Sequence, residues 1–191
     1  MDSNFFALIS RMRYIARWGL MRNALPENIQ EHSHMVAVLA HALGVIRRDI
    51  FHEPCDVNAL ATAALYHDAS EILTGDLPTP IKYHNAEIMS AYHAVEDLAV
   101  QKLLGMLPPE LRPAYEDALH PADPEVEELV KAADKLSAYI KCVEELKAGN
   151  AEFRRAAEQT RAALDAMHLP ELDYFMEHCA ESFSMTLDEL E

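Results

Sequence analysis

Apolar residues recur at helical spacing along most of this chain, and that pattern restricts the fold more than any other feature. Between residues 29 and 46 the apolar side chains lie three, four or seven positions apart, which places them on one face of a helix. Sustained alternation of apolar and polar residues, the mark of strands, is nearly absent, and no Asn-Gly hairpin turn occurs. The sequence therefore predicts an all-α protein.

Caps, glycines and prolines divide the pattern into separate helices. Asp56 and Asp123-Pro124 are typical helix starts, because a carboxylate accepts bonds from free amide groups and proline suits the first turn. Gly149 is a typical stop. We expect helices over residues 4–15, 28–49, 56–70, 85–106, 123–147 and 150–168, with short ones after residues 108 and 170 and near residue 186. Residues 17–26 should form a loop, and residues 74–80, with one glycine and two prolines, should be non-helical.

Length and composition fit one folded domain. Half of the 191 residues are hydrophobic and only five are glycine, which excludes disordered and fibrous classes. The longest nearly apolar stretch, residues 35–46, is far shorter than the roughly 18–20 residues that a membrane span needs. We therefore expect a single domain over residues 1–191, with no membrane partner and no secretory signal.

The charge and the cysteines narrow the partners and the compartment. A net charge of −16 argues against binding of nucleic acid polymers, whose phosphates would be repelled. The first 22 residues nevertheless carry four arginines against one acid, so this segment could attract a small anion or simply pair with acidic neighbours. Three cysteines (Cys55, Cys142 and Cys179) form no CxxC pair, and an odd number cannot all be bridged within one chain. We expect reduced thiols in a cytoplasmic protein.

Four polar residues on three of the expected helices form a candidate metal site: His32, His67, Asp68 and Asp134. Imidazole and carboxylate groups are common ligands of divalent metals. His32 lies on the apolar stripe of its helix and Asp134 at the edge of another, where a carboxylate is costly unless it is paired or bound to a cation. Alone, His32 reads as a core histidine, Asp134 as half of an ion pair, and His67-Asp68 as a polar helix end. Together the four predict a site for one divalent metal.

The order His…His-Asp…Asp resembles that of the HD-domain metal-dependent phosphohydrolases. Further stretches extend the resemblance to the bacterial 5′-deoxynucleotidases of the YfbR type over nearly the whole chain. These stretches are Phe5-Phe6-Ala7, Arg17-Trp18, Leu20-Met21-Arg22-Asn23, Glu27-Asn28, Glu31-His32-Ser33, Tyr66-His67-Asp68-Ala69-Ser70-Glu71, Leu73-Thr74-Gly75-Asp76-Leu77-Pro78-Thr79-Pro80, Ala133-Asp134, Glu144-Glu145-Leu146, Gly149-Asn150 and Asp173-Tyr174-Phe175-Met176-Glu177. The sequence departs from the family pattern at Leu25-Pro26, over residues 108–124 and at Lys135.

The resemblance implies a helical HD-domain fold and hydrolysis of deoxyribonucleoside 5′-monophosphates to deoxyribonucleosides and phosphate. It also implies a homodimer and one divalent metal, with cobalt favoured and manganese or copper as substitutes. HD enzymes that hold two metals use additional histidines, but the spacing of His84, His93 and His120 gives no support for a second metal. Two alternatives stay open: an HD phosphohydrolase acting on a cyclic nucleotide or nucleoside triphosphate, and a non-catalytic metal- or nucleotide-binding module.

The resemblance also assigns roles around the phosphate and the sugar. Arg17 would orient the phosphate through a bidentate guanidinium contact, unless it only forms a surface ion pair. Trp18, the single tryptophan, would form an apolar wall against the sugar, unless it only fills the core. A ribose 2′-hydroxyl left without a partner there would cost about 1–3 kcal/mol.

The remaining assigned residues follow the second half of the HD motif. Glu71 would hold the attacking water or protonate the leaving 5′ oxygen, unless it is only an exposed helix-end carboxylate. Asp76 would accept the 3′-hydroxyl proton, unless it only serves the turn. Leu77, Pro78 and Thr79 would shape the sugar and base pocket, and substrate would also contact the metal ligands His32, Asp68 and Asp134.

Overall fold

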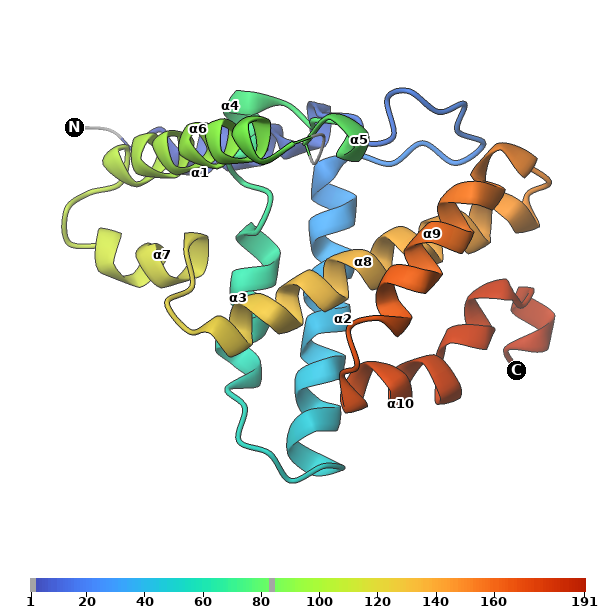
Figure 1. The fold of residues 1–191 in the computed structure, drawn as a ribbon. Helices are drawn as coiled ribbons and strands as arrows, with labels where there is room; N and C mark the ends of the chain where they lie inside the picture. Colours follow the sequence, from blue (N-terminus) through green and yellow to red (C-terminus); the bar gives the residue numbers. More distant parts are fainter. Residues whose placement is uncertain (1–2, 83–84) are drawn as a thin grey trace.

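The computed structural model describes residues 3–82 and 85–191, without the side chains of Thr79 and Pro80. Within these ranges the chain forms α-helices and 3-10 turns, and its β pairing is limited to an isolated bridge between Ala16 and Asn28. The all-α prediction is confirmed (Figure 1). The helices are α1 (Phe5–Ile9), α2 (Ile29–Asp49), α3 (Val57–Tyr66), α4 (Glu71–Thr74), α5 (Thr79–Lys82), α6 (Ala86–Gly105), α7 (Arg112–Leu119), α8 (Pro124–Lys147), α9 (Arg154–Asp165) and α10 (Pro170–His178). The 3-10 turns are η1 (Ser10–Tyr14), η2 (Ala151–Phe153), η3 (Ala180–Ser184) and η4 (Leu187–Glu189).

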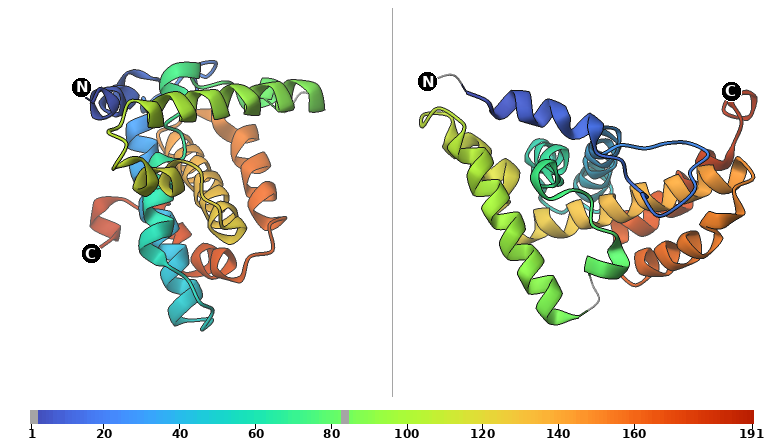
Figure 2. Two further views of the ribbon diagram at one scale, coloured as in Figure 1. Left: turned by 90° about the vertical axis from the view of Figure 1, so that its left-hand side faces the viewer. Right: turned by 90° about the horizontal axis from the view of Figure 1, so that it is seen from above.

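The main core lies where α8 crosses the paired helices α2 and α3 (Figures 1 and 2). The predicted stripe of α2 is buried there, with Val36 and Leu43 fully enclosed. Leu60 of α3 and Leu136 of α8 meet it from the other helices. Each such side chain contributes about 1.5–3 kcal/mol relative to an exposed one. These contacts hold the three helices that carry the candidate ligands in fixed relative positions.

A second core lies under α6, at the end of the α2–α3 pair that carries the candidate site. Phe5 of α1 packs with Leu103 of α6 and with Leu107, and all three are buried. Ala69, between α3 and α4, is part of the same cluster. The chain just after α3 is therefore fixed on the side facing α6.

Several predicted helix boundaries are confirmed at their caps. Asn28 accepts a hydrogen bond from the Glu31 backbone and the Glu31 side chain accepts one from the Asn28 backbone, which forms a capping box at the start of α2. Asp56 and Asp123 cap α3 and α8. Gly149 has a φ of 86°, the left-handed conformation in which glycine ends a helix at little cost.

Other boundaries were wrong. The first helix keeps α geometry only to Ile9 and continues as the 3-10 turn η1 to Tyr14. The third helix ends at Tyr66, and Thr74 closes the separate helix α4. The segment expected to be non-helical is so only over residues 75–78, because Thr79 and Pro80 begin α5, where proline is tolerated in the first turn. In the part of the chain that the structure describes, no helix combines the length and the apolar character needed to cross a membrane.

Candidate functional site

The four predicted ligands come from three helices that meet at one place. His32 lies in the first turn of α2, so the capping box that starts this helix also fixes the position of His32. His67 and Asp68 follow the last turn of α3. Asp134 lies near the middle of α8, with its side chain 40% exposed at the edge of the buried stripe. The structure therefore brings together residues that are far apart in the sequence.

Ligand atoms of His32, His67 and Asp68 are close enough together to share one cation, and Asp134 joins this group through His32. Nε2 of His32 lies 3.0 Å from Oδ1 of Asp134 and 3.6 Å from Oδ2 of Asp68. Nε2 of His67 lies 3.2 Å from the same Asp68 oxygen. Ligand atoms of His32, His67 and Asp68 all lie within 4.8 Å of one another. Two ligands about 2.1 Å from a common metal can be at most about 4.2 Å apart, so a small contraction would complete this site.

Each imidazole is held through its Nδ1 atom, which leaves its Nε2 atom directed at the carboxylates of the cluster. Nδ1 of His67 lies 2.7 Å from the carbonyl oxygen of Ala64, which can only accept, so this nitrogen carries the proton. Nδ1 of His32 lies 3.2 Å from the hydroxyl of Ser137. Both Nε2 atoms are buried and face carboxylate oxygens, that of Asp134 at 3.0 Å for His32 and that of Asp68 at 3.2 Å for His67. Imidazoles held at one nitrogen, with the other nitrogen buried beside carboxylates, fit a divalent cation.

The electrostatics of the cluster also favour a positive charge. Burial alone would raise the pKa of Asp68, but His67, His32 and Arg17 hold it well below its ordinary value. Burial likewise opposes ionisation of Asp134, and the hydrogen bond and charge of His32 nevertheless lower the pKa of this carboxyl. The imidazole of His67 responds in the opposite direction to the carboxyls. Burial would lower its pKa, but Asp68 raises this pKa above its ordinary value. Two ionised carboxylates therefore surround a space that suits a cation.

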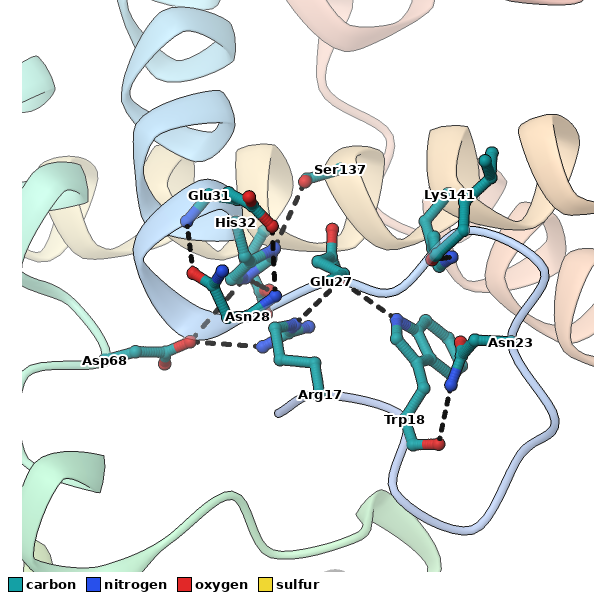
Figure 3. Close-up of polar contacts among 12 residues, drawn as sticks. Arg17, Trp18, Asn23, Glu27, Asn28, Glu31, His32, Asp68, Ser137 and Lys141 are labelled. Atoms are coloured by element: carbon teal, nitrogen blue, oxygen red, sulfur yellow. Dashed lines mark hydrogen bonds and ion pairs between the residues drawn. The ribbon is translucent and has the colours of Figure 1, made fainter. Parts of the chain in front are cut away.

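Arg17 lies beside this cluster. Its Nη1 donates to Oδ2 of Asp68 at 3.2 Å, and its Nε donates to Oε2 of Glu27 at 3.1 Å (Figure 3). Burial would lower the pKa of Arg17, but Asp68, Asp134, Glu27 and Asp76 together raise it. These two bonds engage two of the roughly five N–H groups of the guanidinium.

Trp18 follows in an unusual backbone conformation, with a φ of 58°. Its indole Nε1 donates to Oε2 of Glu27 at 3.1 Å, and its ring packs against Phe153 at a centroid distance of 5.3 Å. The side chain of Trp18 is half-buried, so it does not simply fill the core. Bulky residues rarely have positive φ, and such conformations gather at functional sites.

Two acidic side chains lie on the segment after His67-Asp68. Glu71 is only 6% exposed and its Oε2 has no hydrogen-bond partner among the described residues, so the reading of an exposed helix-end carboxylate was wrong. Burial, followed by the charges of Asp68 and Asp76, raises the pKa of Glu71 to about 9. Asp76 is half-buried, and burial raises its pKa as well. The charge of Asp76 acts on both Glu71 and Arg17, which places it near the cluster.

The rest of the predicted site is described in part. Leu77 and Pro78 are half-buried next to Asp76, whereas the side chain of Thr79 lies outside the described part of the chain. His84, a candidate for a second metal, also lies outside it. His93 and His120 are exposed and lie next to Glu96 and Asp97 instead of the cluster. His34 and His41 are exposed, as their face of the helix predicted.

A buried carboxylate that the sequence reading missed holds the loop after Trp18 against α8. Glu145 is fully buried and accepts hydrogen bonds from the backbone N–H groups of Ala24 and Leu25, both at 2.9 Å. It also accepts bonds from Asn150, at 2.7 Å, and from Lys141. Burial would raise the pKa of Glu145, but these donors lower it to about 2. Ser137 and Glu27 were missed as well; only Ser137, one turn beyond Asp134 on the same face of α8, gave a spacing signal.

Two solved structures of HD phosphohydrolases have a fold similar to that of this chain. An HD-domain phosphohydrolase of Listeria innocua has a TM-score of 0.81 to this chain, with 22% identity, and covers 94% of this chain and 88% of its own. An HD phosphohydrolase of cyanophage S-2L, solved with dA and one catalytic Zn²⁺ ion, has a TM-score of 0.67 and 24% identity, over 95% of this chain and 99% of its own. At these identities the likeness establishes the fold.

Sequence relatives establish the family. The 5′-deoxynucleotidase YfbR of Shigella boydii is 50% identical over 191 residues, covering 99% of this chain and 96% of the relative. A 5′-deoxynucleotidase of Pectobacterium atrosepticum has the same identity and coverage. The family described as 5′-deoxynucleotidase YfbR-like matches residues 4–183. This chain therefore belongs to the YfbR-like family of 5′-deoxynucleotidases, which are phosphoric monoester hydrolases.

Proposed function

We propose that this protein is a metal-dependent 5′-deoxynucleotidase that converts deoxyribonucleoside 5′-monophosphates into deoxyribonucleosides and phosphate. One observation supports it most strongly. The buried Nε2 atoms of His32 and His67 lie beside the carboxylate of Asp68, and the guanidinium of Arg17 contacts the same carboxylate. A metal position and a phosphate-binding group are therefore adjacent in one site.

His32, His67, Asp68 and Asp134 would hold a single divalent cation. When bound, such a cation supplies Lewis-acid chemistry by activating water and polarising a phosphoryl oxygen. Ser137 and the carbonyl of Ala64 keep the two imidazoles oriented for this task, each through the nitrogen that faces away from the cluster. We propose cobalt as the preferred metal, with manganese or copper as substitutes.

Arg17 would bind the phosphate and Glu71 would transfer the proton. The unoccupied guanidinium N–H groups of Arg17 can take two phosphate oxygens at once. Glu71, buried one turn beyond Asp68 with one oxygen that has no hydrogen-bond partner among the described residues, would give a proton to the 5′ oxygen as the phosphate leaves. Because Glu71 is shielded from solvent, its proton would be delivered to the substrate.

Trp18, Asp76 and the segment from Leu77 to Thr79 would select the sugar. The half-buried indole offers an apolar face to the deoxyribose, so a 2′-hydroxyl would lose its hydrogen bonds to water without replacement. Asp76 would accept a bond from the 3′-hydroxyl. Leu77, Pro78 and Thr79 would then line the space for sugar and base. Together these contacts would discriminate between deoxyribose and ribose with little reading of the base.

The deciding experiment is phosphate release from a panel of nucleotides in the presence of a metal series. With cobalt, dAMP should be hydrolysed about 5- to 150-fold faster than AMP, since one unpaired hydroxyl costs about 1–3 kcal/mol. The His67→Ala variant should be inactive with every metal. Equal rates for dAMP and AMP would refute the sugar preference. Faster hydrolysis of a cyclic nucleotide or a nucleoside triphosphate would transfer the assignment to that substrate.

We also propose a homodimer in the cytoplasm. Exposed apolar side chains (Ile88, Val95 and Leu98) recur at three- and seven-residue spacing on α6, which is typical of a helix that packs against a partner. The three cysteines form no disulfide with one another, in keeping with a reducing compartment. Light scattering after gel filtration should give twice the chain mass, and Val95→Glu should give the monomer mass. A wild-type monomer would refute the dimer.

A further inference from the structure

Glu27 contacts the two residues assigned to phosphate and sugar through a single oxygen. Its Oε2 accepts a hydrogen bond from Nε of Arg17 and another from Nε1 of Trp18, both at 3.1 Å (Figure 3). The carboxylate is 15% exposed, so water competes little for these bonds. Two adjacent side chains with different assigned roles therefore share one partner.

The backbone fixes Glu27 opposite these residues. The N–H of Arg17 donates to the carbonyl oxygen of Glu27 at 3.0 Å, and the N–H of Ile29 donates to that of Ile15 at 3.0 Å. The isolated antiparallel bridge between Ala16 and Asn28 lies between these bonds. Since Asn28 also caps α2, Glu27 is held one residue before the cap of the helix that carries His32. These backbone bonds therefore fix the position of Glu27 relative to the candidate metal ligands.

The conformation of Trp18 shows why such a partner is needed. A tryptophan with a φ of 58° is strained, and conformations of this kind cost on the order of 1–3 kcal/mol unless their surroundings hold them. Phe153 supports one part of the ring. Glu27 takes the only hydrogen that the indole can donate. Without Glu27 the ring would keep its packing partner and lose the contact that sets its rotation.

We propose that Glu27 is a positioning residue that holds Arg17 and Trp18 as one unit, so that phosphate orientation and sugar selection are set together. The inference rests on the proposed function for the roles of these two residues. Glu27 touches neither the phosphorus nor the metal ligands in this scheme. It acts by restricting the guanidinium and the indole to one relative arrangement.

Two substitutions separate geometry from charge. Glu27→Ala removes both hydrogen bonds. Glu27→Gln can keep both, because a single oxygen accepts them in the wild type and the glutamine amide has one carbonyl oxygen. Glu152→Ala is the matched control: it removes an ion pair between a glutamate and Arg22 of the same loop, and the polar contacts of Glu152 among the described residues do not include Arg17 or Trp18.

The first readout is the fluorescence of Trp18, the single tryptophan, in the free protein. Glu27→Ala should shift its emission to longer wavelength and increase its quenching by acrylamide, while Glu27→Gln and Glu152→Ala should resemble the wild type. Far-ultraviolet circular dichroism verifies that each variant is folded. Unchanged emission and quenching in folded Glu27→Ala would overturn the positioning of Trp18, whatever the activity of the protein.

The second readout is the ratio of kcat/KM for dAMP to that for AMP. It should fall about tenfold in Glu27→Ala, the loss expected for one hydrogen bond to a charged group, and stay within about twofold of wild type in Glu27→Gln and Glu152→Ala. A carboxylate with only a structural role would lower stability and leave the ratio unchanged, which would refute the inference. A wild type without a deoxy preference would instead refute the proposed function, and the fluorescence would still decide whether Glu27 positions Trp18.

Discussion

The hydroxyl of Ser137 on α8 lies 3.2 Å from Nδ1 of His32 on α2, inside the interface of the two helices. Both side chains are buried, at 3% and 0% exposure. This contact leaves Nε2 of His32 directed at the cluster of Asp68 and Asp134. The interface therefore does more than bury apolar surface, because it also orients a candidate ligand.

Ser137→Ala should weaken metal binding about 10–100-fold, the usual effect of removing the outer partner of a ligating histidine. Isothermal titration with Co²⁺ would measure the affinity. Ser33→Ala is the matched control. The hydroxyl of Ser33 is buried on α2, the helix of His32, but has no hydrogen-bond partner among the described residues, so its loss should leave the affinity unchanged. Equal affinities for both variants would contradict an orienting role for Ser137.

Glu71→Gln should lower kcat about 10²–10⁴-fold, the contribution of a positioned proton-transfer group. The side chain keeps its size, so the Kd for Co²⁺ and the KM for dAMP should change little. Phosphate release and calorimetry would provide the two measurements. A kcat close to the wild-type value would remove Glu71 from the chemistry, and a large loss of metal affinity would point to a ligand role in its place.

Arg17→Lys should lower kcat/KM for dAMP about 10–100-fold, because an ammonium cannot replace charge-assisted bonds worth about 1.5–3 kcal/mol in the planar fork of a guanidinium. Arg22→Lys serves as the control, since the side chain of Arg22 in the same loop is 94% exposed. Steady-state assays on both variants would measure kcat/KM and decide between a phosphate-binding role and an ordinary ion pair for Arg17. Similar activity of the two would favour the ordinary ion-pair reading of Arg17.

Glu145 predicts a particular acid sensitivity. Its pKa is lowered from 4.5 to about 2 in the folded protein, so ionised Glu145 stabilises the fold above its unfolded pKa. This contribution decreases as the pH falls from about 4.5 to about 2, where the folded protein takes up the proton as well. Glu145→Gln should cost about 3–5 kcal/mol at pH 7, because it leaves Lys141 buried without its charged partner. The difference from wild type should shrink towards pH 2.

Urea unfolding at several pH values would measure that difference. Glu144→Gln is the natural comparison, because burial raises the pKa of the neighbouring Glu144, the opposite direction. A raised carboxyl pKa means that ionised Glu144 opposes folding near neutral pH, so this variant should be as stable as the wild type or more stable. A pH-independent deficit for Glu145→Gln would show that lost packing, and not charge, explains its effect.

Much of the fold follows from local signals in the sequence. Asn28, Asp56 and Asp123 accept bonds from amide groups within their own first turns, so their effect does not depend on the rest of the chain. The stop after Tyr66 is different. It depends on how the chain passes beneath α6, where Ala69 is buried, and no local pattern contains that information.

Some residues of the candidate site could likewise be predicted from the sequence, and others could not. His32 and Asp134 were predictable because a polar side chain on or beside an apolar stripe is conspicuous. Glu27 and Glu145 were not, since their partners lie on other segments and a surface carboxylate has the same appearance in the sequence. The burial of Glu71 also escaped notice, because α6 and its neighbours cover that helix end only in the folded chain.

The dispersal of the four candidate ligands over α2, the end of α3 and α8 has a thermodynamic consequence. An unfolded chain would not hold these side chains together, so a cation that they bind would bind the native state almost exclusively. At a free concentration one hundred times its Kd, such a cation would add about 2.7 kcal/mol to the unfolding free energy. The melting temperature of this protein would then report the supply of metal, and starvation for the ion would expose the chain to proteolysis as well as silence it.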